Sequence, residues 1–344
     1  MAATRIVLVG PFAAGQLPAS FARAFERLGH EVHRYDSDHA YFSALTLARY
    51  RVVRRLLRPL LWQRLNRETV DFIRSTRPAL VLTVKGTYLH PSTIRFVRRS
   101  LGIPICNYYP DNPFCGVPWN PRLTSAQRGD LLSALREYTT VWTWERAIVS
   151  RLADAGVTAA YLPFGVDPDI SAAQPSARCG ECSDAHSVVF IGRHTDKRQA
   201  HVAAVRRHAI GLWGSRWRRA ARVLDRRHHI HDRPLAGLAC ASAYAAAPVS
   251  LNIVDDLNMP GHNMRTFEIP ASGGLMLSTH TREQAEFFPE EEAALYYRNL
   301  DELDAKLDRA LGDRAWSARA RRRAAAIAAG HTYTQRVKTM LHAL

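Results

Sequence analysis

The sequence has few cysteines and no long apolar run. Five cysteines among 344 residues are an odd and sparse set, which excludes a disulfide framework. Arginines interrupt the most apolar stretches within a few residues, so no segment is predicted to span a membrane. The first ten residues lack the long apolar region and the small-residue cleavage site of a signal peptide. We therefore expect a cytoplasmic protein.

Patterns of metal ligands are also scarce. Cys179 and Cys182 form a single Cys-x-x-Cys pair, and only His186 lies close to it in the sequence. A zinc site would need a second pair or nearby histidines. The histidines between Arg216 and Arg233 lack the spacing of metal ligands, and this arginine-rich segment is interpreted as a solvated basic face. No metal site is expected.

Acidic residues are outnumbered. The chain has 47 lysines and arginines against 31 aspartates and glutamates, a formal net charge of +16. This balance favours anionic partners, namely nucleic acid, anionic lipid headgroups or phosphorylated substrates, and charge alone does not choose among them. Hydrophobic residues make up 47% and charged residues 23%, which is typical of globular proteins. The length suits two domains.

The amino-terminal pattern predicts a βαβ unit. Residues 5–10 and 31–35 form apolar strands around a helix at 20–28, so a parallel, doubly wound sheet is expected. The loop after the first strand, from Gly10 to Gly15, lacks the Gly-x-Gly-x-x-Gly spacing of a dinucleotide site. The Asp-x-Asp triplet at 36–38, like a second one at 167–169, is interpreted as turn and cap aspartates.

A long helical pattern follows at 45–67. It interleaves leucines with arginines, and Pro59 is expected to break or kink it. The pattern fits an amphipathic surface that meets a membrane or an anionic acceptor. It fits better a helix that packs against the core and exposes an arginine face.

Two further buried strands are predicted at 79–84 and 103–108. Functional groups in open α/β sheets lie beyond the carboxyl ends of the strands. Four polar residues occupy such positions: Lys85, Thr87, Asp111 and Asn112. Asp111 is the candidate for a general base or another acceptor-side group. An Asp-Asn turn between two prolines explains it equally well.

A phosphate cradle is predicted in the second half. The strand at 188–191 ends at Gly192, and basic residues begin the next helix. A glycine at the strand end followed by bases at a helix start suits a phosphate group. Arg193 and Lys197 fit this role best, with Arg198 as a competitor. The alternative is a set of surface bases at a helix start.

The segment from Arg265 to Thr279 predicts a short helix, a glycine stop at Gly273-Gly274 and a buried strand. Arg265 and Glu268 are three residues apart, so they share one helix face near its amino terminus. An arginine for a diphosphate and a carboxylate for ribose hydroxyls would together hold a nucleotide sugar.

Four motifs carry a family resemblance. "RTFEIPASGG" at 265–274 closely resembles the glycosyl-transferase segment of the CgeB-like (spore maturation protein type) family, which is related to the GT4 family of GT-B glycosyltransferases. The loop at Gly192, "LPFGVDP" at 162–168 and "HTYTQR" at 331–336 resemble GT-B motifs in the same order. The resemblance is strongest from Val188 onwards.

The resemblance implies an α/β GT-B fold, with two Rossmann-like doubly wound domains that face a central cleft. The acceptor domain would cover residues 1–168, and a linker rich in Ala, Ser and Pro would cover 169–186. The nucleotide-sugar domain would cover 187–330. The C-terminal helix, residues 331–344, would cross back to the first domain.

The implied activity is transfer of a sugar from a nucleotide-sugar donor to an unidentified glycan, lipid-linked or small-molecule acceptor. Positive charge would stabilise the leaving diphosphate without a metal, and kinship with GT4 implies retention at the anomeric carbon. No cofactor and no nucleic acid are expected as partners, whereas peripheral contact with the anionic inner membrane face is. The expected catalytic residues are Asp111, Arg265 and Glu268. The expected donor-binding residues are Gly192, Arg193, Lys197, Asn263, Arg265, Glu268 and Gly273.

One position departs from the family pattern. GT4 enzymes carry a second glutamate eight residues before the one that matches Glu268, and this chain has Pro260 there. Asn263, Arg265 or His262 are the candidate substitutes. A catalytically degenerate GT-B scaffold is therefore an alternative. A non-enzymatic nucleic-acid-binding protein, with steeply salt-dependent binding, is another, but it gives no reason for Glu268 beside Arg265.

Overall fold

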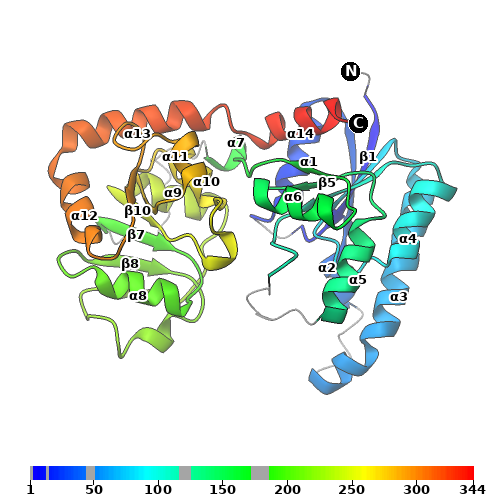
Figure 1. Cartoon of the computed structure of the whole chain (residues 1–344), viewed down its shortest axis with the longest axis horizontal. Coiled ribbons are helices and arrows are strands. Elements are labelled where there is room, and N and C mark those ends of the chain that lie inside the picture. Colours follow the sequence, from blue (N-terminus) through cyan, green and yellow to red (C-terminus); the bar gives the residue numbers. More distant parts are fainter. Residues whose placement is uncertain (1–2, 13–14, 44–50, 116–124, 172–185) are drawn as a thin grey trace. The chain divides into compact units, whose positions relative to one another are not determined.

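The chain forms two compact units. The computed structural model describes residues 3–12, 15–43, 51–115, 125–171 and 186–344. Unit 1 comprises Met1–Pro163 and Val337–Leu344, and unit 2 comprises Phe164–Arg336. Each unit is built around its own parallel sheet with flanking helices (Figure 1). Most of the predicted linker, including Cys179 and Cys182, lies outside the described residues.

Unit 1 contains a six-stranded sheet in the order β2-β1-β3-β4-β5-β6, with all neighbouring strands parallel. The strands are β1 (Arg5–Gly10), β2 (Glu31–Asp36), β3 (Leu80–Val84), β4 (Ile105–Tyr109), β5 (Val141–Thr143) and β6 (Ala159–Tyr161). The helices are α1 (Leu17–Arg27), α2 (Ser37–Ser43), α3 (Arg51–Thr76), α4 (Pro91–Arg95), the π-helical turn η1 (Phe96–Ser100), α5 (Ser125–Leu135) and α6 (Arg146–Asp154).

The core of unit 1 follows from its apolar strands. Strands β3 and β4 are buried along their whole length, as expected for parallel strands covered on both faces. Helix α1 adds Phe21 and Phe25, which are fully buried, and the ring of Phe21 lies 5.1 Å from that of Tyr108. The predicted turn role of Asp36 is confirmed, because its Oδ1 accepts hydrogen bonds from the backbone N–H groups of Asp38 and His39.

The prediction that Pro59 interrupts the long helix is wrong in part. Helix α3 runs from Arg51 to Thr76 with Pro59 inside it. Its carboxyl-terminal half is held by the core through Leu65, which is 3% exposed, whereas Leu57 and Leu60 are 38% and 62% exposed. The expected packing against the core therefore holds for the second half of the helix and not for these two leucines.

Unit 2 contains a six-stranded parallel sheet in the order β12-β11-β10-β7-β8-β9. Counted within the unit, this is the strand order 3-2-1-4-5-6 of doubly wound dinucleotide-binding folds. The strands are β7 (Val188–Ile191), β8 (Ile210–Trp213), β9 (His229–Ile230), β10 (Val249–Asn252), β11 (Met276–Thr279) and β12 (Leu295–Tyr297). The predicted pair of doubly wound sheets is thus confirmed.

The helices of unit 2 surround strands that are largely buried. They are α7 (Pro168–Ser171), α8 (Asp196–Ala204), η3 (Trp217–Ala220), α9 (Leu238–Ala246), η4 (Asp256–Asn258), α10 (Arg265–Ala271), α11 (Arg282–Phe287), α12 (Glu302–Gly312), α13 (Arg314–Ala328) and α14 (Tyr333–His342). Helix α14 begins in unit 2, and its residues from Val337 onwards belong to unit 1. Across the described ranges, no helix is both long enough and apolar enough to cross a membrane.

Candidate functional site

The candidate donor site lies at the point where the strand order of unit 2 reverses. Strands β7 and β10 are neighbours there, and the chain winds away from them in opposite directions. Ligands of open α/β sheets bind outside the carboxyl ends of such strands. Ile191 ends β7, and its carbonyl oxygen accepts a hydrogen bond from Nε of Arg265, the first residue of α10. The predicted Gly192 loop and the predicted Arg265 helix therefore meet at this place.

The loop at Gly192 is held by its backbone. Its N–H donates to the carbonyl of Trp213 at 2.8 Å, and Nε1 of Trp217 donates to its carbonyl at 2.7 Å. Gly214 lies so close that a β-carbon there would be 2.0 Å from the Gly192 oxygen, and its φ of +141° favours glycine. Gly214 lets its loop pack against the loop at Gly192, and this contact fixes the position of the Arg193 backbone.

Three arginines gather around this loop. Nη1 of Arg198 donates to the carbonyl of Arg193 at 2.8 Å, and its Nη2 lies 3.6 Å from the carboxylate of Asp255. The Nε atoms of Arg193 and Arg198 are buried and make no hydrogen bond within the described part of the chain. Burial, together with the charges of Arg265 and Arg193, lowers the pKa of Arg198 to about 10, against the opposing effect of Asp255. The cluster has an excess of positive charge and unused donors, which suits a bound anion.

Lys197 lies in the first turn of α8, as predicted, and is paired with a carboxylate. Its Nζ lies 2.6 Å from the carboxylate of Asp256, whose side chain is 80% exposed. Such an exposed pair contributes about 0–1 kcal/mol, so it is readily exchanged for another anion. Arg198, which the sequence offered as a competitor, is the residue that donates a hydrogen bond to the Gly192 loop, and its charge interacts with that of Arg265.

Glu268 lies on α10, one turn after Arg265, and is partly buried. Its carboxylate makes no hydrogen bond or ion pair with any residue that the structure describes. Burial raises the pKa of Glu268 above its ordinary value, and the nearby Arg265 guanidinium offsets part of this rise. A partly buried carboxylate with unused acceptor oxygens suits the hydroxyl groups of a ligand.

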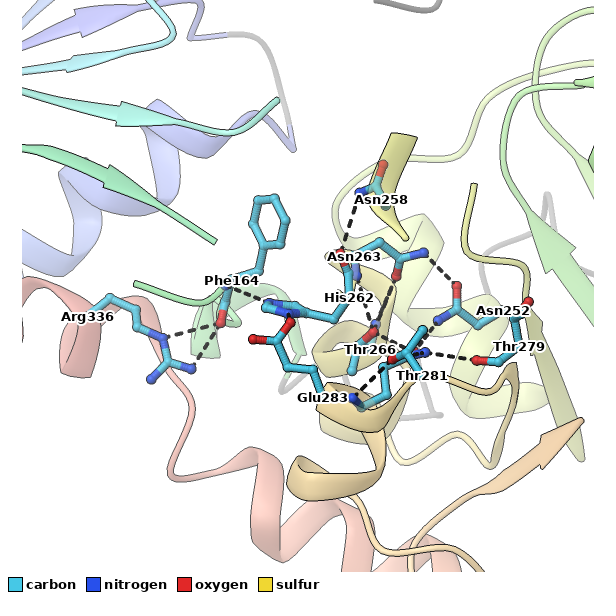
Figure 2. A network of polar contacts seen from close by, with 11 residues as sticks. Phe164, Asn252, Asn258, His262, Asn263, Thr266, Thr279, Thr281, Glu283 and Arg336 are labelled. Carbon is cyan, nitrogen blue, oxygen red and sulfur yellow. Dashed lines mark hydrogen bonds and ion pairs between the residues drawn. The ribbon is translucent and has the colours of Figure 1, made fainter. Parts of the chain in front are cut away.

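A buried polar network positions α10 (Figure 2). Its centre is Gln284, which is fully buried on α11. Its Oε1 accepts hydrogen bonds from Asn252, Thr266 and Ser278, which lie on β10, α10 and β11. Its Nε2 donates to the carbonyl of Thr279 at 2.9 Å. Because one side chain joins four elements, the start of α10 is fixed relative to the sheet.

Asn263 belongs to this network. Its Oδ1 accepts from the backbone N–H of Thr266 at 3.2 Å, and its Nδ2 donates to Oδ1 of Asn252 at 2.9 Å. The side chain therefore begins α10, and it is only 6% exposed. Asn263 therefore positions the start of the helix that carries Arg265. The sequence predicted a direct contact with the donor instead.

His262 is occupied inside the protein. It is fully buried, its Nδ1 lies 2.9 Å from Oε2 of Glu283, and its Nε2 accepts the backbone N–H of Phe164 at 3.2 Å (Figure 2). The carbonyl of Phe164 accepts two hydrogen bonds from Arg336, at 2.9 and 3.2 Å. Both ring nitrogens are used, so His262 does not replace the missing glutamate at Pro260.

The segment 162–168, which contains Phe164, also contacts the segment 331–336 at the end of unit 2. Val166 forms a parallel bridge with Thr332, and a β-carbon at Gly165 would lie 2.9 Å from the carbonyl oxygen of His331. Two motifs of the family resemblance, at 162–168 and 331–336, are therefore partners in one structural junction. No direct role in binding follows from this geometry.

We expect the stability of unit 2 to fall in mild acid because of His331. Burial and the charge of Arg336 lower the pKa of His331 from 6.5 to about 4. The unfolded chain then takes up the proton more readily, so stability is full above pH 6.5 and falls as the pH decreases from 6.5 to about 4. Urea unfolding at pH 7.5 and 5 should show a smaller decrease for His331→Asn than for the unmodified chain. An equal decrease would contradict this assignment.

Gly273 does not lie with the other predicted donor residues. It ends α10 with a φ of +75° and precedes β11, so it is at the amino end of the sheet, whereas Arg265 is at the carboxyl end. Its carbonyl accepts Nε of Arg321 at 2.6 Å. It also lines a hollow of about 720 Å³ beside α13. Gly273 is a helix stop, and the sequence could not show that α10 carries it away from the site.

The carboxyl edge of the unit 1 sheet brings two of the predicted acceptor-side residues together. Nζ of Lys85 lies 2.6 Å from Oδ2 of Asp111, and Lys85 has a φ of +67°. Asn112 accepts the backbone N–H of Phe114 at 3.0 Å, which is the turn role that the sequence left open. Thr87 is exposed. Lys85 and Asp111 therefore form an ion pair at this edge, and the acceptor-side roles of the four residues stay predictions.

Comparisons with known proteins agree with this architecture. Residues 193–342 match the model of a glycosyl transferase-like family. HepE from Anabaena, solved with UDP-glucose, aligns with a TM-score of 0.67 and 13% identity over 99% of this chain and 100% of its own. A glycosyltransferase from Rickettsia africae aligns with a TM-score of 0.69 and 11% identity over 100% of this chain and 98% of its own. Sucrose-phosphate synthase from Thermosynechococcus elongatus aligns with a TM-score of 0.68 and 12% identity over 98% of this chain and 98% of its own.

The chain has the GT-B fold. No curated protein sequence matches it. The family model matches most of the unit that carries the arginine cluster, from residue 193 onwards, and it does not single out the CgeB-like branch.

Sequence reasoning ranked Arg198 below Lys197 and did not consider Asp255. The spacing of Arg198 on α8 differs by only one residue from that of Lys197, so no local pattern separates them. The close approach of the Gly192 loop decides between them, and it depends on Trp217 from a distant segment.

Proposed function

We propose that the chain is a glycosyltransferase that takes its sugar from a nucleotide-sugar donor bound to unit 2. The observation that carries the proposal is the cluster of Arg193, Arg198 and Arg265 at the switch point of the sheet. Within the described residues, the ion pair that these three cations make is that of Arg198 with the carboxylate of Asp255, at 3.6 Å. A diphosphate would supply the missing negative charge.

The cluster would act on the leaving group. When the bond between the anomeric carbon and the diphosphate breaks, negative charge builds up on the diphosphate oxygens. Fixed guanidinium groups stabilise that charge without reorganising, which is the largest contribution in many enzymes. We therefore propose transfer that does not depend on a metal ion at the diphosphate. Kinship with GT4 adds the proposal of retention at the anomeric carbon.

The remaining residues would bind the two substrates. Glu268 would accept hydrogen bonds from the ribose hydroxyls, because its oxygens are unused and it shares a helix with Arg265. On unit 1, Asp111 would accept the proton of the acceptor hydroxyl, with Lys85 holding its carboxylate in place. HepE was solved with UDP and with UDP-glucose, which makes uridine nucleotides the first donors to test.

A thermal-shift screen tests the donor class. UDP-, GDP-, ADP-, CMP- and dTDP-sugars should be compared, each with and without EDTA. We expect at least one diphosphate sugar to raise the melting temperature, with EDTA having no effect. If no nucleotide sugar binds and the chain instead binds nucleic acid with a steep salt dependence, the proposal is wrong and the net charge serves that partner.

The role of Glu268 can be separated from that of the arginines. Glu268→Ala should weaken UDP binding about tenfold or more, because a hydrogen bond to a charged group contributes about 1.5–3 kcal/mol. The same variant should bind 2′,3′-dideoxy-UDP as well as the unmodified chain does. Calorimetric titration of both ligands into both proteins measures the difference. Equal losses for the two ligands would remove Glu268 from the ribose.

A further inference from the structure

Three histidines gather on one face of the unit 2 sheet, at the strand edge formed by β8 and β9. Side chains two residues apart in a strand point to the same face. Gly211 and Trp213 therefore share a face on β8, and His229 and His231 share it at β9. His186, just before β7, completes the group, because its ring centre lies 4.8 Å from that of His229 and 5.5 Å from that of His231.

The rings of His186 and His231 are each packed against strand β8. The ring of His231 stacks on Trp213, with centroids 4.1 Å apart and planes 8° apart. The ring of His186 lies directly over Gly211, where an added β-carbon would be 2.4 Å from Cδ2 of the imidazole. The ring of His186 thus packs against the sheet at a position where a residue with a β-carbon would clash with it.

The separation between the two rings is informative. Nε2 of His186 lies 3.3 Å from Nε2 of His231. Two imidazole nitrogens bound to one tetrahedral zinc ion, each at about 2.0–2.1 Å, are about 3.3 Å apart. The same separation also allows a direct hydrogen bond between the two rings. The same two atoms therefore have the spacing and the chemistry of ligands for a transition metal.

We propose that His186 and His231 bind a divalent transition-metal ion through their Nε2 atoms, with Zn²⁺ the first choice. The part of the chain that the structure describes holds no group of three or more His, Cys, Asp or Glu side chains suited to a metal ion. The two imidazoles are thus the protein ligands among the described residues.

The ion would act as a structural clip. It would join His186, two positions before β7, to His231, the residue after β9, across three adjacent strands. Strand β9 is only two residues long and lies at the edge of the sheet, so backbone pairing alone holds it weakly. Binding energy gained by the folded pair adds to the stability of that edge. This site is independent of the donor site and of the proposed transfer reaction.

Metal analysis of protein purified without a histidine tag tests the proposal. The chain is stripped with a chelator, dialysed against Zn²⁺ and analysed by mass spectrometry, and Zn²⁺ affinity is measured by calorimetry. We expect about one bound ion per chain, and an affinity at least about tenfold lower in His186→Ala and His231→Ala, since even partners outside the coordination sphere cost that much. His208→Ala, which removes a histidine paired with Asp308 elsewhere in unit 2, is the matched control.

Two further measurements protect the test against misfolding. His186→Gln retains a polar side chain over Gly211, and its unfolding without metal should match that of the unmodified chain. Hydrogen exchange at β9 should slow on addition of Zn²⁺ in the unmodified chain and not in His186→Gln. Absence of Zn²⁺ binding in the unmodified chain, or an equal loss in His208→Ala, would overturn the proposal and leave a hydrogen bond between the two rings.

Discussion

Replacing Arg265 by alanine is expected to weaken binding of the nucleotide-sugar donor, and turnover with it, by about 100-fold or more. One fixed donor to a developing negative charge contributes a factor of about 10²–10³ to catalysis. Arg265 is also the residue through which α10 contacts the end of β7, by its bond to the carbonyl of Ile191. Donor affinity is measured by calorimetry, and donor hydrolysis replaces transfer until an acceptor is known.

Two further variants show whether the loss of donor affinity in Arg265→Ala is due to this guanidinium group. Arg265→Lys retains the charge and loses the planar group that reaches both Ile191 and an anion, so it should recover only part of the affinity. Arg319→Ala removes an exposed arginine of α13 in the same unit and should bind donor normally. Circular dichroism shows whether each variant is folded. A folded Arg265→Ala protein with unchanged donor affinity would end the assignment of the site.

Replacing His262 by alanine should lower the free energy of unfolding of unit 2 by roughly 3 kcal/mol, the size expected when a buried carboxylate loses a hydrogen-bond partner. The change takes a partner from Glu283, which is 7% exposed, and from the backbone N–H of Phe164. It also leaves a cavity beside the rings of Phe267 and Phe287.

The measurement must report on unit 2 alone, because a chain with two units need not unfold in one step. Hydrogen exchange of the segments in β10 and β11 serves this purpose. His39→Ala, at an exposed histidine of α2, is the control and should change nothing in unit 2. If exchange in these strands were as slow in His262→Ala as in the unmodified chain, the network in Figure 2 would contribute little to stability.

Local patterns predicted the elements that carry the site. An apolar run that ends at Gly192 marked β7, and one that follows Gly273-Gly274 marked β11. The spacing of Arg265 and Glu268 placed both on one turn of α10. Such features depend on a few neighbouring residues, and burial of the strands then follows from their composition. The GT-B fold followed from several such motifs in order.

The details that failed depend on partners far along the chain. His262 looked like a polar residue near the donor, and its engagement by Phe164 joins positions 98 residues apart. Gly273 fitted a motif, but the length and direction of α10 decide that it lies at the other end of the sheet. The histidines of β9 lacked metal spacing within their own segment, and only the pairing of β8 with β9 sets His231 beside His186.

The division of the chain has a consequence for its biosynthesis. Unit 2 is one continuous segment, Phe164–Arg336, whereas unit 1 also includes Val337–Leu344. During translation, unit 1 is therefore incomplete until all of unit 2 has left the ribosome, although the six strands of its sheet are made first. A nascent chain paused before Val337 would carry unit 1 with an uncovered apolar patch, because Val337 and Met340 are buried in the finished fold.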